Sequence, residues 1–209
     1  SGSRLFPRGS VSRVMPETTL GRYRILEPLG HGGMGQVFLA EDPVLGRQLA
    51  VKVLPDEFSQ DRGRRERLLD EARAASALNH PNIVVIHDAG ETDGRVWIAM
   101  ERIEGQTLRE WARVKESPER ILKVMRQVLA ALAVAHDAGL VHRDLKPDNL
   151  MVRSDGLVKI LDFGLARSLD AEEDGRTVTM PGMMVGTPSY MSPEQVLGKP
   201  AGPPSDLFS

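Results

Sequence analysis

Residues 142–149 read His-Arg-Asp-Leu-Lys-Pro-Asp-Asn, directly after a segment, Ile121–His136, that is apolar around most of a helical circumference. A helix of that kind belongs in a protein core. In the polar loop that follows, Asp144 can accept a hydroxyl proton, Lys146 can neutralise phosphate and Asn149 can ligate a hard cation through its amide oxygen. The stretch therefore predicts a loop that handles phosphate next to a buried helix.

A second acidic signal lies a few residues further along the chain. Asp162, Phe163 and Gly164 follow a short β-like segment, Val158–Leu161. A carboxylate at the end of a strand, followed by a flexible glycine, is suited to bind Mg²⁺. Taken singly, the tripeptide is equally typical of a turn.

Glycines dominate residues 30–37, which read Gly-His-Gly-Gly-Met-Gly-Gln-Val between the β-like segments Tyr23–Leu26 and Gln36–Ala40. Glycines let backbone N–H groups approach phosphate oxygens without a Cβ in the way. In a dinucleotide-binding fold the glycines would open a helix, but here no helical pattern begins before about residue 64. We expect a phosphate-covering hairpin; a plain glycine turn is the alternative.

Lys52 lies in a third β-like segment, Gln48–Leu54, with apolar neighbours on both sides. A buried ammonium group needs a partner, because uncompensated burial of charge is costly. The amphipathic segment Arg64–Leu78 offers Glu71 on the same side as Ala75. The alternative is a lysine on an edge strand that points to solvent.

Composition excludes several classes of function. The chain has 209 residues, a net charge of −2 and no cysteine, which excludes disulfides, thiolate catalysis and cysteine-ligated zinc. The near-zero net charge argues against nucleic acid as a partner. No apolar run is long enough for a membrane segment. Residues 1–14 resemble an expression-tag remnant.

The pattern of segments predicts an α+β organisation. Residues 15–101 form a β-rich lobe, with further strands expected at Ile83–Ile86 and Val96–Met100; residues 102–105 form a connector, and residues 106–209 form a helical lobe. A polar, methionine-rich loop is expected over Ser168–Met184. Clefts between lobes are favoured ligand sites.

In this order, the motifs resemble the eukaryotic-type (Hanks-type) Ser/Thr protein kinase family, over about residues 20–209. Residues 78–84 (Leu-Asn-His-Pro-Asn-Ile-Val) and 186–195 (Gly-Thr-Pro-Ser-Tyr-Met-Ser-Pro-Glu-Gln) most resemble its bacterial branch. The resemblance implies a bilobal fold with an antiparallel N-lobe and one main helix. It also implies an incomplete C-lobe, because family members continue through further helices and supply an arginine partner for Glu194.

The resemblance implies a transfer of the ATP γ-phosphate to protein Ser/Thr hydroxyls, with Mg²⁺ or Mn²⁺. Lys52, paired with Glu71, would hold the α- and β-phosphates. Asp144 would deprotonate the substrate hydroxyl, Lys146 would lie near the γ-phosphate, and Thr187 would bond both. The metal ligands would be Asn149 and Asp162. The nucleotide would also contact Leu29, Gly30, Gly32, Gly35, Val37, Ala50, Met100, Glu101, Ile103, Met151 and Leu161.

Three further roles follow from the same resemblance. Arg143 would sense a phosphorylated activation loop, with Thr177 and Thr179 as phosphorylation sites; the alternative is that both are ordinary loop threonines. Asp206 would support the backbone of residues 142–144. The apolar spine that joins the lobes would consist of Ala75, Ile86, His142 and Phe163.

We therefore expect a non-specific Ser/Thr protein kinase that acts on protein substrates in the cytoplasm. The sequence leaves open whether the full-length protein has a membrane anchor outside these residues. In this chain, ATP binding is expected to persist and phosphotransfer to be weak. The apolar face left on residues 121–136 would be covered by self-association, by a swapped segment or by the N-terminal residues. The alternative is an ATP-binding pseudokinase or scaffold; a small-molecule phosphotransferase fits residues 186–194 less well.

Overall fold

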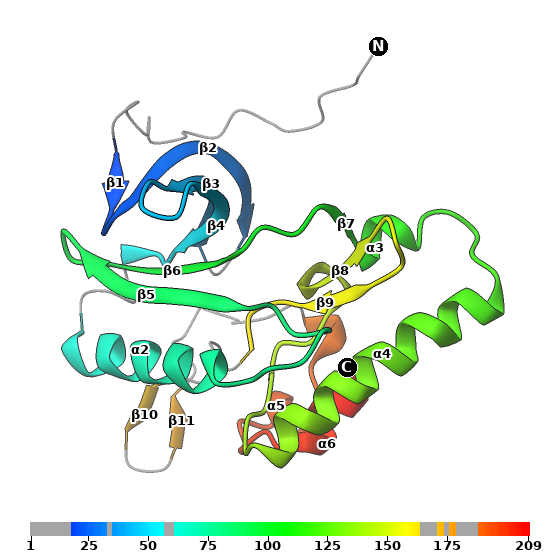
Figure 1. Ribbon diagram of the computed structural model, residues 1–209. Helices are drawn as coiled ribbons and strands as arrows, with labels where there is room; N and C mark the ends of the chain where they lie inside the picture. The colour runs from blue at the N-terminus through cyan, green and yellow to red at the C-terminus, as the bar shows by residue number, and fades with distance from the viewer. Residues whose placement is uncertain (1–17, 33–34, 57–60, 164–170, 174–175, 179–187) are drawn as a thin grey trace.

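The computed structural model describes residues 18–32, 35–56, 61–163, 171–173, 176–178 and 188–209. Residues 1–14, Gly164, Thr179 and Thr187 lie outside these ranges. The N-terminal half contains a six-stranded antiparallel sheet in the order β1-β2-β3-β4-β6-β5 (Figure 1). Its strands are β1 (Thr19–Leu20), β2 (Tyr23–Gly32), β3 (Gly35–Asp42), β4 (Arg47–Val53), β5 (Ile86–Thr92) and β6 (Arg95–Glu101).

Both faces of this sheet are packed against other residues. Successive residues of a strand point to opposite faces, so the central strands contribute to two core clusters. On one face Leu49 and Val51 of β4 join Trp97 in a core cluster. On the other face Ala50 packs with Ile98 in a second cluster, which includes Ala72 of helix α2. The near-continuous apolar run in β4 thus reflects a strand that is covered on both sides.

Helix α2 (Arg62–Ser76) covers one face of the sheet and lies along β5 (Figure 1). The side chain of Asp61 caps its N-terminus by accepting a hydrogen bond from the backbone N–H of Arg64 at 2.8 Å. The helix buries Leu68, Ala72 and Ala75. The predicted main helix is confirmed, and its bounds lie two residues earlier than the apolar pattern indicated.

The C-terminal half is mainly helical, around the three-stranded sheet β7 (Gly105–Thr107), β8 (Leu150–Arg153) and β9 (Val158–Ile160). Helix α4 (Pro118–Asp137) begins at a Ser117 cap and buries Val124, Val128 and Leu132. Its remaining face carries side chains that are 38–63% exposed, which confirms the predicted apolar surface. These are Ile121, Leu122, Met125, Leu129 and Val134.

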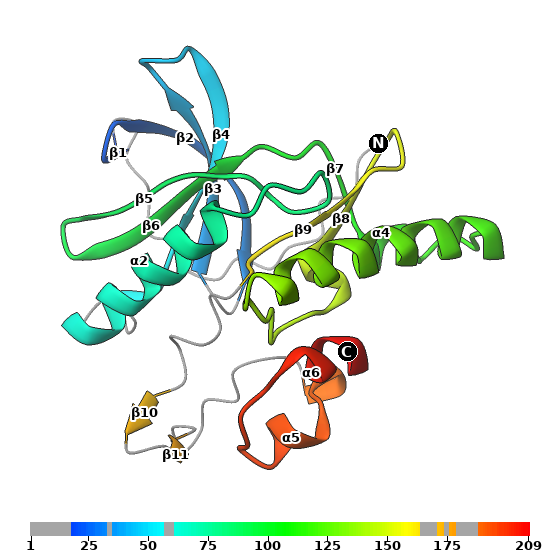
Figure 2. The ribbon, with the colours of Figure 1, turned by 60° about the horizontal axis from the view of Figure 1, so that its bottom comes forward.

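Short elements complete this half: α3 (Leu108–Trp111), η1 (Pro147–Asn149), η3 (Pro188–Tyr190), α5 (Pro193–Val196) and α6 (Pro203–Phe208). Figure 2 shows α5 and α6 below α4. Within the predicted loop, β10 (Ala171–Glu173) and β11 (Arg176–Val178) pair antiparallel, and Thr177 lies on β11.

The strand predicted at Ile83–Ile86 is wrong for its first three residues. Ile83 makes only an isolated bridge to Ile160, and β5 begins at Ile86. The Val84 N–H donates to the carbonyl of Ile160 at 2.9 Å. The segment is apolar because Ile83 and Val84 are buried, so burial rather than membership of the large sheet explains the pattern.

Candidate active site

A buried ion pair joins the two halves of the chain. Lys52 Nζ lies 2.8 Å from Asp162 Oδ2, and the two side chains are only 5% and 15% exposed. Lys52 is the last but one residue of β4, and Asp162 follows two residues after β9. Lys52 and Asp162, which lie 110 positions apart in the sequence and belong to two different motifs, are therefore in direct contact.

The expected pairing of Lys52 with Glu71 is not what the structure shows. Among the described residues, Lys52 forms its ion pair with Asp162 and none with Glu71. The backbone of Asp162 is in the left-handed region, with φ of 58°, a conformation uncommon outside glycine. The Asp162 carboxylate is therefore the partner of the buried Lys52 ammonium group, whereas the sequence pattern had pointed to a partner on α2.

Phe163, the residue after Asp162, anchors the turn at Asp162 in the core. Its side chain is 1% exposed and belongs to the core cluster that includes Ala75 and Leu132. The rings of Phe163 and His142 meet edge to face, with centroids 5.0 Å apart and planes at 65°. Three of the residues predicted for the apolar spine, Ala75, His142 and Phe163, are thus packed in the interior, and Ile86 lies against the same cluster.

The loop 142–149 gathers its polar side chains around one carboxylate. Lys146 Nζ lies 2.6 Å from Asp144 Oδ2. The amide nitrogen of Asn149 donates to the same carboxylate oxygen at 3.0 Å and to the Asp144 carbonyl at 2.8 Å. Both bonds use the nitrogen of the Asn149 amide, which leaves its oxygen available to a ligand.

Two hydrogen bonds, one between backbone groups and one from a side chain, tie this loop to the segment that carries Asp162. The Leu161 N–H donates to the Asn149 carbonyl at 2.8 Å, and His142 Nε2 lies 2.7 Å from the Leu161 carbonyl. The Asp144 N–H donates to His142 Nδ1 at 3.2 Å. Because Nδ1 accepts, the neutral ring carries its proton on Nε2 and donates to Leu161. The Asn149 carbonyl and the His142 ring thereby hold Leu161, the residue before Asp162, against the loop.

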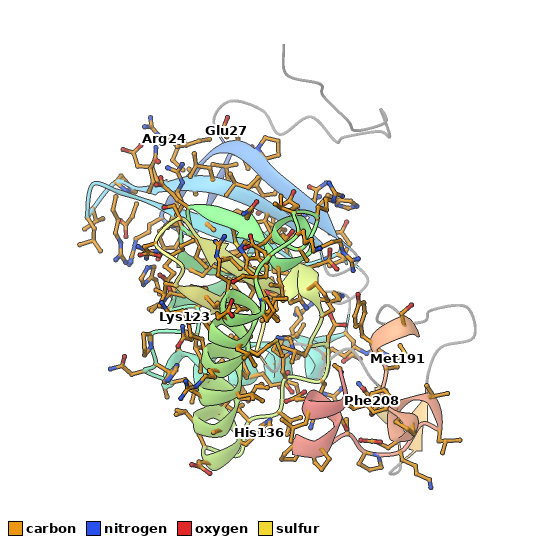
Figure 3. All side chains as sticks on the ribbon, turned by 90° about the vertical axis from the view of Figure 1, so that its right-hand side faces the viewer. Arg24, Glu27, Lys123, His136, Met191 and Phe208 are labelled. Atoms are coloured by element: carbon orange, nitrogen blue, oxygen red, sulfur yellow. The ribbon has the colours of Figure 1, made fainter. Side chains whose placement is uncertain are left out.

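Asp206 supports the backbone of the loop 142–149, as the resemblance implied. Its buried carboxylate accepts from the backbone N–H groups of His142 at 2.8 Å and Arg143 at 2.7 Å. It also lies 2.8 Å from His136 Nε2; Figure 3 shows His136 on α4 near α6. Gln195 donates to the Arg143 carbonyl at 2.6 Å. Both polar backbone groups of Arg143 are therefore fixed, which supports its positive φ of 68°.

Sequence reasoning gave no role to His136 or Gln195. The sequence pattern made His136 part of an apolar helix, and it made Gln195 the last residue of the stretch 186–195 without assigning a role to its side chain. Glu194 accepts a hydrogen bond from Ser205 Oγ, which holds the pKa of its carboxyl below the ordinary value.

Some of the residues predicted to contact the nucleotide belong to one apolar cluster, and others lie outside it. Val37, Leu161 and Ile103 pack against a cluster that contains Ala50 and Met100. Val37 is directly opposite Lys52 in the strand register, and Ala50 is opposite Met100. Leu29 is 49% exposed and Met151 is half-buried, and neither belongs to that cluster. An apolar wall therefore lies next to the Lys52–Asp162 pair.

Glycine geometry supports close backbone approach at the β2–β3 turn. Gly32 is opposite Gly35 in the register. Gly35 has φ of 117°, and a Cβ there would lie 2.1 Å from the Val53 carbonyl oxygen, so a side chain is excluded. At Gly30 a Cβ would meet nothing within 4 Å. That open side is where a ligand could approach the backbone.

The end of β6, just before the connector, is held by an ion pair that sequence reasoning did not anticipate. Lys159 Nζ, 7% exposed, lies 2.5 Å from Glu101 Oε1, which also accepts from the Val85 N–H at 2.8 Å. The signal was present in the alternation of Val158, Lys159 and Ile160, which placed a lysine in a buried strand.

A divalent cation with phosphate fits this donor set. Asp162 supplies a carboxylate and Asn149 an amide oxygen, the hard ligands that Mg²⁺ takes together with phosphate and water. Over the described ranges, no group of three or more His, Asp and Glu side chains is gathered for a metal ion. The residues present thus fit a cation that arrives with phosphate ligands of its own.

Comparison with known proteins agrees with this geometry. The family model described as "Protein kinase domain" matches residues 23–209. The chain is 45% identical over 199 residues to the serine/threonine-protein kinase PknA of Mycobacterium tuberculosis, and 41% identical over 191 residues to PrkC of Bacillus subtilis. These matches cover 92% and 90% of this chain, but only 45% of PknA and 29% of PrkC.

A solved structure shows the same fold. The crystal structure of the Mycobacterium tuberculosis PknI kinase domain has a TM-score of 0.71 and 30% identity, over 93% of this chain and 73% of that chain. Over the ranges described above, none of the helices combines the length and apolarity needed to cross a bilayer. The match to the family model over residues 23–209 shows that the chain belongs to the protein kinase domain family.

Proposed function

We propose that this chain binds ATP with Mg²⁺ between its β-rich and helical halves and transfers the γ-phosphate to Ser or Thr hydroxyls of proteins. The proposal rests above all on the 2.8 Å contact between Lys52 and Asp162. A buried cation beside a carboxylate, next to an apolar wall and an open glycine turn, suits a triphosphate–metal complex. The names of the relatives PknA and PrkC support the choice of Ser/Thr kinase.

In this proposal the residues of the chain divide the work. Lys52 binds the α- and β-phosphates, Asp162 and Asn149 hold Mg²⁺, and Met100, Glu101 and Ile103 border the adenine. Glu71 is the proposed partner of Lys52 once Asp162 is engaged by the metal. The metal ion would supply charge neutralisation on the triphosphate.

Asp144 is the proposed general base. Its Oδ2 accepts from both Lys146 and Asn149, which orients the carboxylate and leaves Oδ1 to take a proton from the substrate hydroxyl. Lys146, already beside Asp144, can neutralise charge that develops on the transferred phosphoryl group. Thr187 and the modification sites Thr177 and Thr179 remain predictions from the sequence.

Incubation with γ-labelled ATP, Mg²⁺ and a protein acceptor tests the proposal. The wild type should transfer label to Ser or Thr, and Asp144→Asn should abolish the transfer while ATP still binds. A scaffold that only binds ATP would show no transfer in either form. The experiment should include the chain extended beyond Ser209, because the relatives are longer than this chain.

A further inference from the structure

Arg109, on α3, makes a two-pronged contact with the catalytic loop. Its Nε donates to Asp148 Oδ1 at 2.7 Å, and a terminal nitrogen donates to Oδ2 at 2.7 Å. The same guanidinium group lies 3.5 Å from the Tyr190 hydroxyl and 5.9 Å from the centre of its ring. Such a planar, parallel pair of bonds is geometrically specific. Arg109 therefore joins three segments: α3, η1 and η3.

The contact involves the same loop as the proposed base. Asp148 is four residues after the proposed base Asp144 and immediately before Asn149. Tyr190 belongs to residues 186–194, which fit a kinase of protein substrates better than a small-molecule phosphotransferase. Both side chains of the ion pair are 42% exposed, so a bound peptide can reach them.

Arg109 changes the charge that such a peptide meets. An uncovered Asp148 would attract lysine or arginine side chains of a substrate. The guanidinium group of Arg109 donates to both oxygens of the Asp148 carboxylate, at 2.7 Å each, and matches its negative charge with a positive one. With both oxygens engaged by Arg109, Asp148 has no free negative charge to offer.

The neighbouring surface adds positive charge. A cavity of about 770 Å³ borders this pair, and its wall includes Arg109, Arg113, Lys115, Pro147 and Tyr190. Its one acidic wall residue, Glu116, is ion-paired with Arg120 at 2.5 Å. Across the residues whose positions are described, Arg113 and Lys115 form no ion pair. The charges left unpaired at this wall are therefore positive.

We propose that Arg109 determines substrate specificity: it caps Asp148 so that the kinase selects acceptor peptides with acidic side chains next to the phosphorylated residue and rejects basic ones. The inference rests on the proposed function, because it needs a peptide to lie along the loop of Asp144. It goes beyond that function by naming the chemistry of the peptide. Specificity here comes as much from repulsion of the wrong charge as from attraction of the right one.

Two acceptor peptides that differ only in Glu or Lys at the positions flanking the phosphorylated residue test the inference. Their relative kcat/KM and their relative affinities, measured by fluorescence anisotropy with a non-hydrolysable ATP analogue, are compared across variants. The wild type should favour Glu. Arg109→Ala should lower the Glu-to-Lys ratio by about fivefold, the size expected for exposed charges. Asp148→Asn should raise the ratio, and the double variant should lie between the two.

Arg153→Ala is the matched control, because Arg153 is also 42% exposed and pairs with an aspartate, Asp155, at 2.9 Å. It should leave the ratio unchanged. A ratio that does not move in Arg109→Ala, a wild type that favours Lys, or an absence of peptide binding would overturn the inference. Failed ATP binding with an intact Glu preference would instead count against the proposed function and leave the role of Arg109 standing.

Discussion

Two ion pairs of nearly equal length differ in burial: one lies between the two halves of the chain, and the other includes Asp148 of the loop 142–149. Lys52–Asp162 spans 2.8 Å with side chains 5% and 15% exposed, whereas Arg109–Asp148 spans 2.7 Å with both side chains 42% exposed. A buried charge that loses its partner is costly, but an exposed one is solvated by water. In the proposed function the first pair would therefore couple stability to ligand binding, whereas a change at the second would alter selectivity with little effect on the fold.

Removing the buried cation should produce the largest combined effect, on stability and on phosphotransfer. Lys52→Met leaves Asp162 in a mostly buried place without its ion pair, which should destabilise the free protein by roughly 3 kcal/mol. Phosphotransfer should fall by roughly 10²–10³-fold, because a charge that stabilises the triphosphate is lost. Urea denaturation and labelled-phosphate transfer measure the two effects. Wild-type stability and ATP affinity in this variant would contradict the comparison.

Asp206→Asn should destabilise the loop 142–149, which contains Asp148 of the exposed pair. The carboxylate accepts from two backbone N–H groups and faces His136, and an amide in its place presents a donor to donors. The expected loss is roughly 2–4 kcal/mol in the free energy of unfolding. Hydrogen exchange at the amides of His142 and Arg143 should accelerate. The exposed Asp70→Asn serves as the control and should leave both measurements near wild type.

Tyr23 of β2 provides a smaller effect on stability, one that depends on pH. Burial, with a hydrogen bond to Asp88, raises the pKa of Tyr23 from 10.0 to about 12. The folded protein thus favours the neutral phenol. The associated stability is full below pH 10 and is lost as pH rises from 10 to about 12, by at most about 3 kcal/mol. Urea denaturation across this range should show that Tyr23→Phe removes the slope; an unchanged slope would refute the assignment.

The smallest effect on stability is expected at the exposed pair. Arg109→Ala should leave the urea midpoint within experimental error of wild type, because both groups can be solvated by water. A thermal or urea melt of Arg109→Ala beside Lys52→Met gives the contrast directly. If Arg109→Ala destabilised the protein as much as Lys52→Met, burial would not be what separates the two pairs.

The fold was largely predictable from the sequence because its strands and main helices carry clear periodicity. The pattern around Lys52 gave the buried strand, and the run Ile121–His136 gave α4. The error at Ile83–Val85 arose because burial makes a segment apolar whether or not it joins a sheet. The candidate site was predictable as a set of residues, since each motif has a distinctive spacing.

Contacts within the site were less accessible to sequence reasoning. The partner of Lys52 depends on the left-handed turn at Asp162, which no local pattern indicates. The Glu101–Lys159 pair and the role of His136 depend on side chains that meet across the core, and hydrophobic periodicity treats such residues only as interruptions. The two-pronged bond of Arg109 to Asp148 is likewise a product of tertiary packing.

The most direct test of the central claim is calorimetric titration of ATP, with and without Mg²⁺, into the wild type and Asp162→Asn. If Lys52 and Asp162 share one triphosphate–metal complex, Mg²⁺ should strengthen ATP binding to the wild type and have little effect on Asp162→Asn. Equal enhancement by Mg²⁺ in both proteins, or no ATP binding to the wild type, would contradict it.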